Sequence, residues 1–569
     1  MIDAPPALAL RIGTRASALA MVQARHVAAC LEGRGVATTL VTITTDGDRR
    51  TPDTPWGEGA FVSAIEDALL HGSIDLAVHS AKDVPTDEDP RLRIAAFLPR
   101  ADPDDVLVLP HGRRIAALDD LPMGTRVGTD SPRRTAFLRA ARPDLRVHPL
   151  HGNVDTRLRR LDDGDTDALI LAAAGLTRLG RADRISLALP THLLPPAPGQ
   201  GALAIQIRSD DRACAERVAR LDDPDTRRSV VAERRLLAAA GGGCRAPLGA
   251  LGLVRGGRLR LEAGIATPDG TIAVLARGSA VVGDAAAERA LRDRVLRSLA
   301  ERAVAAAERA GRPRVVVTRP TPGSAATVLA LVDRGLAPVP VPTIRVDHGL
   351  PGSAAGLVEA LRSADWVVLA SANAVAGVLV AAADAGLDLV DGPGAAARRW
   401  AAVGPTVERA LRAAGIDVAV RPAEATAAAL AEAVPIHHGD RVVVPRGDLA
   451  DDRLPARLAA RGARVDAPLV YRTVVGPGAS MRRFRDAMRR GPRAVLFTSG
   501  STVRGWVDLA RRAGMTGAAR AIPAIAIGPS TAAEARLRGL SVVAVAAGPD
   551  PATAAQAVAD AIHPTLEEA

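Results

Sequence analysis

The chain has little cysteine and few aromatic residues. Its 569 residues include three cysteines (Cys30, Cys214 and Cys244), five Phe, four Trp and one Tyr. Three scattered thiols are too few for a disulfide framework or a zinc site, which favours a reducing compartment and leaves no metal expected. Because 48% of the residues are nevertheless apolar, we expect about three to five domains whose cores are packed from aliphatic side chains and alanine.

Lysine is almost absent. Lys82 is the only lysine among many arginines, and the net charge is +10. A chain this basic raises the question of a nucleic-acid partner. However, the sequence contains no basic tract, no alternation of basic and aromatic residues and no nucleic-acid-binding motif. Arginine also forms bidentate pairs with carboxylates, so the charge fits a small polyacidic molecule, and we expect no nucleic acid.

No apolar run predicts a membrane span. One uncharged stretch, Trp366–Ala383, holds Ser371 and Asn373 and divides into a predicted strand, a turn and an alanine-rich helix. The first residues, Met1–Leu10, lack the basic region that opens a secretory signal peptide. We therefore expect a cytoplasmic protein with no membrane partner.

The first polar turn of interest lies near the N-terminus. Leu8–Ile12 is predicted to be a strand, and a helix is predicted from about Ala18 to Glu32. Arg15 and Ser17 lie between them and would form an anion site, because a helix N-terminus adds unpaired N–H groups. Ser17 as an ordinary helix cap explains the same segment equally well.

A second polar cluster follows a buried run. The stretch from Ile74 to Val78 predicts a buried strand, and Lys82 and Asp83 come just after its C-terminal end. This is the edge at which α/β sheets bind ligands. A Lys–Asp pair is also common in solvated loops, so its position at the sheet edge, rather than its composition, favours a site.

Further arginines follow predicted strands. The segment RVGTDSPRR predicts a strand, a turn at Ser131 and a helix whose first turn holds Arg133 and Arg134. Cations there oppose the helix dipole at a cost of roughly 0.3–1 kcal/mol each, so the pair indicates an anion bound between them. Similar turns downstream contribute His151, Arg157 and Arg178.

One thiol lies in a glycine-rich loop. Cys244 follows three glycines and precedes Arg245, between a run of helix formers and the predicted strand Leu248–Val254. The glycines end the helix and permit positive φ, and the arginine favours the thiolate. A lone cysteine is more often a small buried apolar residue. The anion sites upstream favour a thiol that serves a site.

Seven segments, in order, resemble porphobilinogen deaminase (hydroxymethylbilane synthase): GTRASALA, HSAKDVP, GTDSPRR, GNVDTRL, AAAGLTRLG, PAPGQGAL and GGGCRAPLG. The resemblance covers Leu8 to about Ala310. It implies two lobes of the periplasmic-binding-protein kind, followed by a small α+β domain. It also implies a dipyrromethane cofactor, built from two substrate units and joined to Cys244 by a thioether, and no metal.

The same resemblance implies a role for each candidate residue. Asp83 is the implied catalytic aspartate, with Lys82 beside it. His151 stands where the family usually has arginine, which weakens one carboxylate contact, and Ala81 stands where the family usually has Met or Leu. The implied cofactor contacts are Ser131, Arg133 and Arg134, and the implied substrate contacts are Arg15, Ser17, His151, Arg157 and Arg178.

After Gly311–Pro313, which we expect to be a short linker, the sequence contains a duplicated α/β unit. VVVTRP recurs as VVVPRG, LASANAV as FTSGSTV, and VGPTVERAL as IGPSTAAEA, at nearly constant spacing. Each copy ends a predicted strand with Ser, Thr, Gly or Asn and then begins a helix. Backbone N–H groups would thus face a shared cleft, although ordinary helix caps explain the same residues.

The order of these segments, from about Arg314 to Ile562, resembles uroporphyrinogen-III synthase. The resemblance implies two flavodoxin-like lobes, with the chain crossing between them through Val341–Pro351 and Val470–Gly476. Tyr471, the only tyrosine in the chain, lies in the second crossing. The implied site residues are Ser371, Asn373, Tyr471, Thr498, Ser499 and Thr531.

The sequence thus predicts an α/β protein with two functional halves. Residues 1–310 would be a hydroxymethylbilane synthase with lobe 1 at about 1–100 and 200–222, lobe 2 at about 101–199 and the Cys-bearing domain at about 223–310. Residues 311–313 would be the linker, and 314–569 a uroporphyrinogen-III synthase with lobe A at about 314–345 and 474–569 and lobe B at about 350–470.

The implied function is a bifunctional enzyme of tetrapyrrole synthesis. It would condense four porphobilinogen molecules to hydroxymethylbilane with release of ammonia, and then cyclise the product, with inversion of ring D, to uroporphyrinogen III. The alternative, from another class, is a non-catalytic bilobal anion-binding protein. In either case we expect a monomer whose partners are small polyacidic molecules, here pyrroles.

Overall fold

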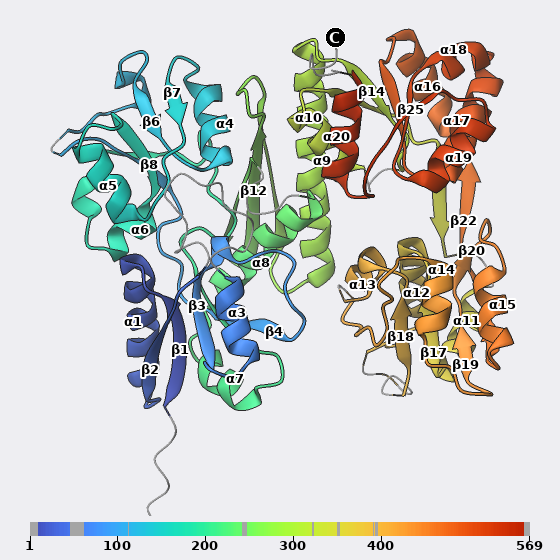
Figure 1. Ribbon diagram of the computed structural model, residues 1–569, viewed down its shortest axis with the longest axis horizontal. Helices are drawn as coiled ribbons and strands as arrows, with labels where there is room; N and C mark the ends of the chain where they lie inside the picture. The colour runs from blue at the N-terminus through green and yellow to red at the C-terminus, as the bar shows by residue number, and fades with distance from the viewer. Residues whose placement is uncertain are drawn as a thin grey trace, which may run out of the picture.

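A computed structural model describes residues 9–45, 62–111, 113–241, 247–320, 324–349, 353–390, 392, 397–412 and 414–562. Within these ranges the strands form six sheets, three in the N-terminal half and three in the C-terminal half. The chain is mixed α/β, and Figure 1 shows the two halves side by side. No helix of the described residues is both long enough and apolar enough to cross a bilayer.

The first sheet has the strand order β2-β1-β3-β10-β4. Strand β1 runs parallel to β2 and β3, whereas β10 returns from far along the chain and pairs antiparallel with β3 and β4. Helices α1 and α7 cover one face and α3 covers the other, so the central strand β3 is buried at every position except its last, whereas the edge strand β2 is not. Its elements are β1 (Leu10–Arg15), α1 (Ala18–Glu32), β2 (Thr38–Ile43), α3 (Ser63–Leu70), β3 (Leu76–Ser80), η1 (Ala81–Asp83), β4 (Leu92–Phe97), β10 (Leu203–Arg208) and α7 (Arg212–Ala219).

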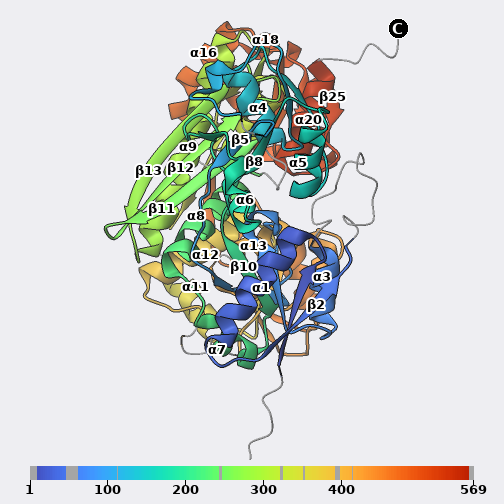
Figure 2. The same ribbon diagram turned by 90° about the vertical axis from the view of Figure 1, so that its left-hand side faces the viewer.

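The second sheet has the order β7-β6-β8-β5-β9. Its strands β6, β7 and β8 are parallel, and β5 pairs antiparallel with β8 and β9. Figure 2 shows this unit above the first sheet. Its elements are β5 (Asp105–Val108), η2 (Leu118–Asp120), β6 (Arg126–Gly128), α4 (Pro132–Ala141), β7 (Arg146–His148), α5 (Val154–Asp162), β8 (Ala168–Ala172), α6 (Ala173–Arg178), η3 (Ala182–Arg184) and β9 (Leu187–Leu189).

A three-stranded antiparallel sheet and two helices follow. The sheet carries its apolar residues on the face toward α8 and α9. A turn precedes strand β13, where Asp269 accepts hydrogen bonds from the Thr271 backbone N–H (3.1 Å) and hydroxyl (2.9 Å). The elements are α8 (Pro224–Ala239), β11 (Leu248–Arg255), β12 (Arg258–Ala266), β13 (Ala273–Val281) and α9 (Ala285–Arg309).

The C-terminal half begins and ends in one parallel sheet, β15-β14-β23-β24-β25. The chain therefore leaves this sheet after β15 and returns to it at β23. Its elements are β14 (Arg314–Val317), α10 (Ala325–Asp333), β15 (Ala337–Pro340), η4 (Gly478–Ser480), α16 (Met481–Arg489), β23 (Ala494–Phe497), α17 (Gly500–Ala513), α18 (Thr516–Ala521), β24 (Ala524–Ala526), α19 (Pro529–Leu537), β25 (Val542–Val545) and α20 (Pro551–Ile562).

The intervening residues form a second parallel sheet, β18-β17-β19-β21, and a crossing ribbon in which β16 and β22 pair antiparallel. Both predicted crossings lie in this ribbon. The uncharged stretch after Trp366 is a strand, a turn and a helix, as predicted. The elements are β16 (Ile344–His348), α11 (Ser353–Arg362), β17 (Trp366–Leu369), α12 (Ala372–Asp384), β18 (Arg399–Ala402), α13 (Pro405–Arg412), α14 (Ala427–Ala433), β19 (Arg441–Val443), β20 (Arg446–Gly447), α15 (Arg453–Ala460), β21 (Arg464–Asp466) and β22 (Leu469–Val475).

One apolar core contains residues of both halves. Leu299 and Ala303 of α9 belong to the same buried cluster as Val328 and Leu329 of α10. Figure 1 shows α9 and α10 side by side, between the β11–β13 sheet and the β14 sheet. The halves are thus joined by a packed interface as well as by the short connection at Gly311–Pro313.

Candidate active site

A cleft of about 400 Å³ lies between the first two sheets and gathers nine of the predicted site residues. Its walls come from α1 and η1 on one side and from α4, α5 and α6 on the other. Cys244, the predicted attachment residue, lies outside the described residues. The predicted residues that line the cleft are Arg15, Ser17, Lys82, Asp83, Ser131, Arg133, Arg134, Arg157 and Arg178.

The two cleft serines are helix caps as well as cleft residues. The Ser17 hydroxyl accepts a hydrogen bond from the Ala20 backbone N–H (3.4 Å) at the start of α1. The Ser131 hydroxyl accepts one from the Arg134 backbone N–H (3.4 Å) at the start of α4. The cap and the site are therefore compatible explanations, because a capping hydroxyl lies at the helix end that borders the cleft.

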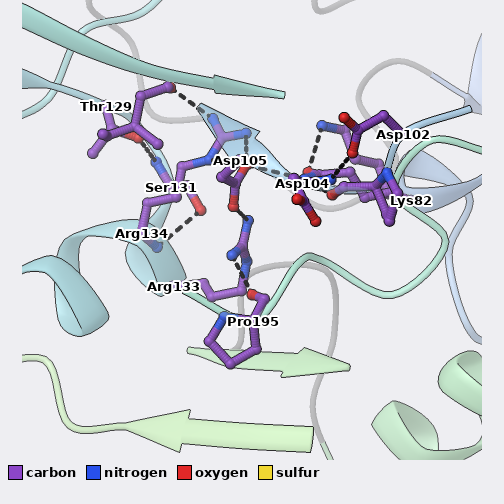
Figure 3. Close-up of polar contacts among 12 residues, drawn as sticks. Lys82, Asp102, Asp104, Asp105, Thr129, Ser131, Arg133, Arg134 and Pro195 are labelled. Carbon is purple, nitrogen blue, oxygen red and sulfur yellow. Dashed lines mark hydrogen bonds and ion pairs between the residues drawn. The ribbon is translucent and has the colours of Figure 1, made fainter. Parts of the chain in front are cut away.

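A buried carboxylate lies between Arg133 and Arg134 (Figure 3). Asp105 Oδ2 accepts a hydrogen bond from Arg133 Nη2 (2.7 Å), and Oδ1 accepts from Arg134 Nη2 (2.6 Å) and Nε (3.0 Å). All three side chains are buried. Burial alone would raise the pKa of Asp105, but the two guanidiniums outweigh it and hold that pKa well below its usual range. The anion that the sequence predicts between these arginines is thus supplied by the protein.

Each of these two arginines also donates to a backbone oxygen. Arg133 donates to the backbone oxygen of Pro195, and Arg134 Nη1 donates to the backbone oxygen of Ile170 (3.0 Å). Both guanidiniums are therefore fixed in place by the protein. A ligand in the cleft would experience their charge from rigid positions, which lowers the conformational cost of binding.

Gln200 connects the arginine cluster to the lysine. Gln200 Nε2 donates to Asp105 Oδ1 (3.0 Å) and to the Pro103 backbone oxygen (2.7 Å), while Gln200 Oε1 accepts from Lys82 Nζ (3.2 Å). Burial, together with the charge of Arg134, lowers the pKa of Lys82 to about 8. Gln200 is fully buried. Sequence analysis missed it, since the segment PAPGQGAL predicts only a rigid turn.

Asp83 is the exposed carboxylate of the cleft. It ends η1, and its side chain makes no hydrogen bond or ion pair with the described residues. Arg157 donates through Nε to the Gly152 backbone oxygen (2.7 Å), and burial followed by the charge of Arg134 lowers its pKa to about 10. Burial also lowers the pKa of Arg178. Desolvated like charges are costly when alone, so this cleft favours a ligand with several carboxylates.

His151 lies behind the cleft wall. Its Nδ1 is 3.1 Å from Asp130 Oδ2, and its side chain is buried. Asp130 lines the cleft, whereas His151 is not among the lining residues. The predicted contact between His151 and substrate therefore stays a prediction. Other polar lining residues that sequence analysis missed are Gln23, Ser80, Asp130, Asn153 and Gln200.

In the C-terminal half the predicted residues fall into two groups. Ser371 caps α12, where it accepts from the Ala374 backbone N–H (3.1 Å), and its hydroxyl lies 3.4 Å from the Tyr471 hydroxyl. Asn373 is in the first turn of the same helix. The second group consists of Thr498 and Ser499, which lead into α17, and Thr531 in the first turn of α19.

Tyr471 lies in the crossing ribbon, against the sheet formed by β17 and its neighbours. A methyl group added at Gly447 would lie 2.3 Å from the Tyr471 ring, so only glycine permits this approach. On the neighbouring strand β16, His348 lies opposite Tyr471, and the centroids of the two rings are 6.0 Å apart. The tyrosine is thus fixed by packing, with its hydroxyl directed to Ser371.

Comparisons with known proteins cover both halves. Residues 10–216 match the family model "Porphobilinogen deaminase, dipyromethane cofactor binding domain", and 228–292 match "Porphobilinogen deaminase, C-terminal domain". The porphobilinogen deaminase of Acidothermus cellulolyticus is 49% identical over 272 residues, which is 46% of this chain and 81% of that protein. The enzyme of Mycobacterium marinum is 47% identical over 286 residues, covering 48% of this chain and 90% of that protein.

Residues 325–556 match the family model "Uroporphyrinogen-III synthase HemD". A uroporphyrinogen III synthase structure from Thermus thermophilus aligns at 22% identity over 44% of this chain and 98% of that chain, with a TM-score of 0.35. A periplasmic substrate-binding protein of an ABC transporter from Coxiella burnetii aligns at 17% identity over 38% of this chain and 93% of that chain, with a TM-score of 0.26. The chain belongs to the porphobilinogen deaminase family and carries a uroporphyrinogen-III synthase family unit fused after it.

Proposed function

We propose that the chain carries out two consecutive steps of tetrapyrrole synthesis. The first half condenses four porphobilinogen molecules head to tail with release of four ammonia, and one water then releases the product as hydroxymethylbilane. The second half closes this linear tetrapyrrole with loss of water and inversion of ring D, giving uroporphyrinogen III. The observation that carries the first step is the cleft in which one exposed carboxylate, Asp83, lies among desolvated cations.

The charges of the cleft match the charges of the substrate. Porphobilinogen has two carboxylates, so a growing chain accumulates negative charge with every unit. A hydrogen bond between a guanidinium and a carboxylate contributes roughly 1.5–3 kcal/mol. Arg15, Arg157 and Arg178 therefore bind and orient the acid side chains, and their number suits a ligand longer than one pyrrole.

Asp83 acts on the reacting centre. Loss of ammonia from porphobilinogen leaves a cationic methylene-pyrrole, and the pyrrole carbon that attacks it must then lose a proton. The Asp83 carboxylate, which lines the cleft, can offset both positive charges electrostatically. It can also hold the departing proton. Lys82, fixed by Gln200, supplies a neighbouring positive charge that can pair with an acid side chain of the substrate.

The described residues fit a dipyrromethane cofactor. When bound, this group supplies a covalently anchored pyrrole end to which substrate units are added. Ser131, Arg133 and Arg134 lie in the part of the cleft formed by α4 and would hold its carboxylates. Cys244 is the proposed attachment residue.

In the second half, the paired hydroxyls of Ser371 and Tyr471 lie on one sheet unit, and Thr498, Ser499 and Thr531 lie on the other. We assign both groups to the cyclisation site. Hydroxyls and helix N-termini bind carboxylates without a net cation. Such a site can hold ring D while the hydroxyl group of the substrate leaves.

The six sheets support a division into the lobes expected from sequence. We assign periplasmic-binding-protein-like lobes to 1–100 with 200–222 and to 101–199, and a Cys-bearing domain to 223–310. Flavodoxin-like lobes are assigned to 314–345 with 474–569 and to 350–470. We further propose a cytoplasmic monomer that acts on pyrrole acids and binds neither nucleic acid nor membrane.

Asp83→Asn and Asp83→Glu test the first step together. The amide should retain substrate binding and lose nearly all turnover, whereas the glutamate should retain a measurable rate because it keeps the charge. Porphobilinogen consumption gives the rate, and intact mass gives any covalent pyrrole adduct. Binding without consumption or adduct in the wild-type chain would favour the non-catalytic anion-binding alternative.

A further inference from the structure

Helix α9 of the deaminase half is buried on two sides. One side packs on β12 and β13, and the other contacts α10 and β15 of the synthase half. Leu299 and Ala303 of α9, and Val328, Leu329 and Val332 of α10, are each no more than 2% exposed. These side chains form a single core, so the synthase half provides part of the apolar packing of the Cys-bearing domain.

Polar contacts close the edge of this interface. Glu308 at the end of α9 pairs with Arg490 of the synthase half at 2.7 Å. At the junction, Arg312 is paired with Asp269 and donates to the Thr271 hydroxyl (2.6 Å), both on the turn before β13. The connection between the halves is therefore bound to the surface of the Cys-bearing domain.

The synthase half also contacts the start of the loop that leads to Cys244. Helix α8 ends just before Gly241, which has a φ of 71°. A methyl group added at Gly241 would lie 3.3 Å from Pro551 Cγ and 3.4 Å from Ala326 Cβ. Both contacted residues belong to the synthase half, at the starts of α20 and α10.

We propose that the docked synthase half is a structural support of the Cys-bearing domain, so that deaminase activity depends on the surface formed by α10 and the start of α20. The proposal rests on the proposed function only for its activity readout. Two leucines of α10 provide a matched test. Leu329 belongs to the core shared with α9, whereas Leu331 faces the synthase's own sheet, and both are almost fully buried.

The test compares Leu329→Ala with Leu331→Ala in the full chain. Leu329→Ala should lower the temperature at which half of the porphobilinogen consumption is lost by about 4 °C or more. Leu331→Ala should shift this temperature much less, although it lowers the temperature at which the synthase half unfolds. Tryptophan fluorescence reports that unfolding in a Trp56→Phe background, because the three remaining tryptophans, Trp366, Trp400 and Trp506, all lie in the synthase half.

Hydrogen exchange of Ala285–Arg309 tests the docking without any assay of activity. Peptides from this helix should exchange faster in Leu329→Ala than in Leu331→Ala. Equal exchange in the two variants, or a deaminase half-inactivation temperature that Leu329→Ala does not lower beyond Leu331→Ala, would overturn the proposal. If the wild-type chain consumes no porphobilinogen, the proposed function fails, and the exchange difference still decides the structural support.

Discussion

Asp105 offers the sharpest test of the charge network. Its carboxylate accepts hydrogen bonds from Arg133, Arg134 and Gln200 and is completely buried. Asp105→Asn keeps the shape, but it removes the charge and turns an N–H₂ group toward at least one of these donors. Breaking a buried ion pair from one side costs about 3–5 kcal/mol, because the remaining charges stay buried without compensation. For a cooperative unit of roughly 150–250 residues, this loss of folding free energy corresponds to a melting temperature lower by roughly 6–20 °C.

Asp104 is the matched control. It is the preceding residue, and no arginine in the described part of the chain pairs with it, while burial and the charges of Asp102 and Asp105 raise its pKa. Asp104→Asn removes a repelled carboxylate and should leave the melting temperature unchanged or slightly higher. Calorimetry of the full chain measures both variants. If Asp105→Asn melts within about 2 °C of the wild type, the buried carboxylate contributes no net stability and the reasoning is wrong.

The same residue predicts the sign of an acid effect. Folding lowers the pKa of Asp105 below the value of about 3.9 in an unfolded chain. Its stabilising contribution is therefore complete above about pH 4 and is lost as the pH falls through the folded pKa. The stability difference between wild type and Asp105→Asn should accordingly narrow in acid. If the stability difference between the two proteins widens below pH 4, Asp105 does not have a lowered pKa in the folded chain.

Three further substitutions test the two sites. Since the pKa of Lys82 is about 8, substrate binding should weaken as the pH rises through 8. A plot of kcat/KM against pH should therefore fall above pH 8 in the wild type, and this fall should be absent in Lys82→Arg. His151→Arg should lower the half-saturating porphobilinogen concentration, unless Asp130 captures the new guanidinium and leaves kinetics unchanged. Tyr471→Phe should raise the fraction of the symmetric type I isomer among oxidised products, and an unchanged isomer ratio would remove the tyrosine from the cyclisation step.

Local sequence rules predicted the elements that position the cleft. Runs such as Leu76–Ser80, which leads to Lys82, and Ala168–Ala172, which leads to Arg178, are buried strands followed by polar residues at the sheet edge. These two strands lie in different sheets, so the rules predict a polar edge for each sheet, whereas the meeting of the two edges at the cleft depends on how the sheets pack. The same rules gave Ser17 as either a helix cap or an anion-site residue, and in the structure it caps α1 and also lines the cleft.

The interior of the site could not be predicted in this way. Asp105 occurs in the sequence Asp102-Pro103-Asp104-Asp105, which reads as a solvated acidic turn, and only tertiary contact with α4 shows that its last residue is buried. Gln200 is likewise uncharged and flanked by Gly199 and Gly201, both at positive φ. The three hydrogen bonds of its side chain all join it to residues about a hundred positions earlier in the chain.

The contact between the halves did leave a signal, which the duplication makes visible. Helices α10 and α15 follow the equivalent strands of VVVTRP and VVVPRG. Helix α15 is amphipathic: Leu454 and Leu458 are buried, and Arg453 and Arg457 are exposed. Helix α10 has no charged residue before Asp333 and no exposed residue. A helix that is apolar all round must be covered on every side. Its own sheet and α20 cover two sides of α10, and α9 of the deaminase half covers another. The difference between the two copies therefore marks the surface that the fusion buries.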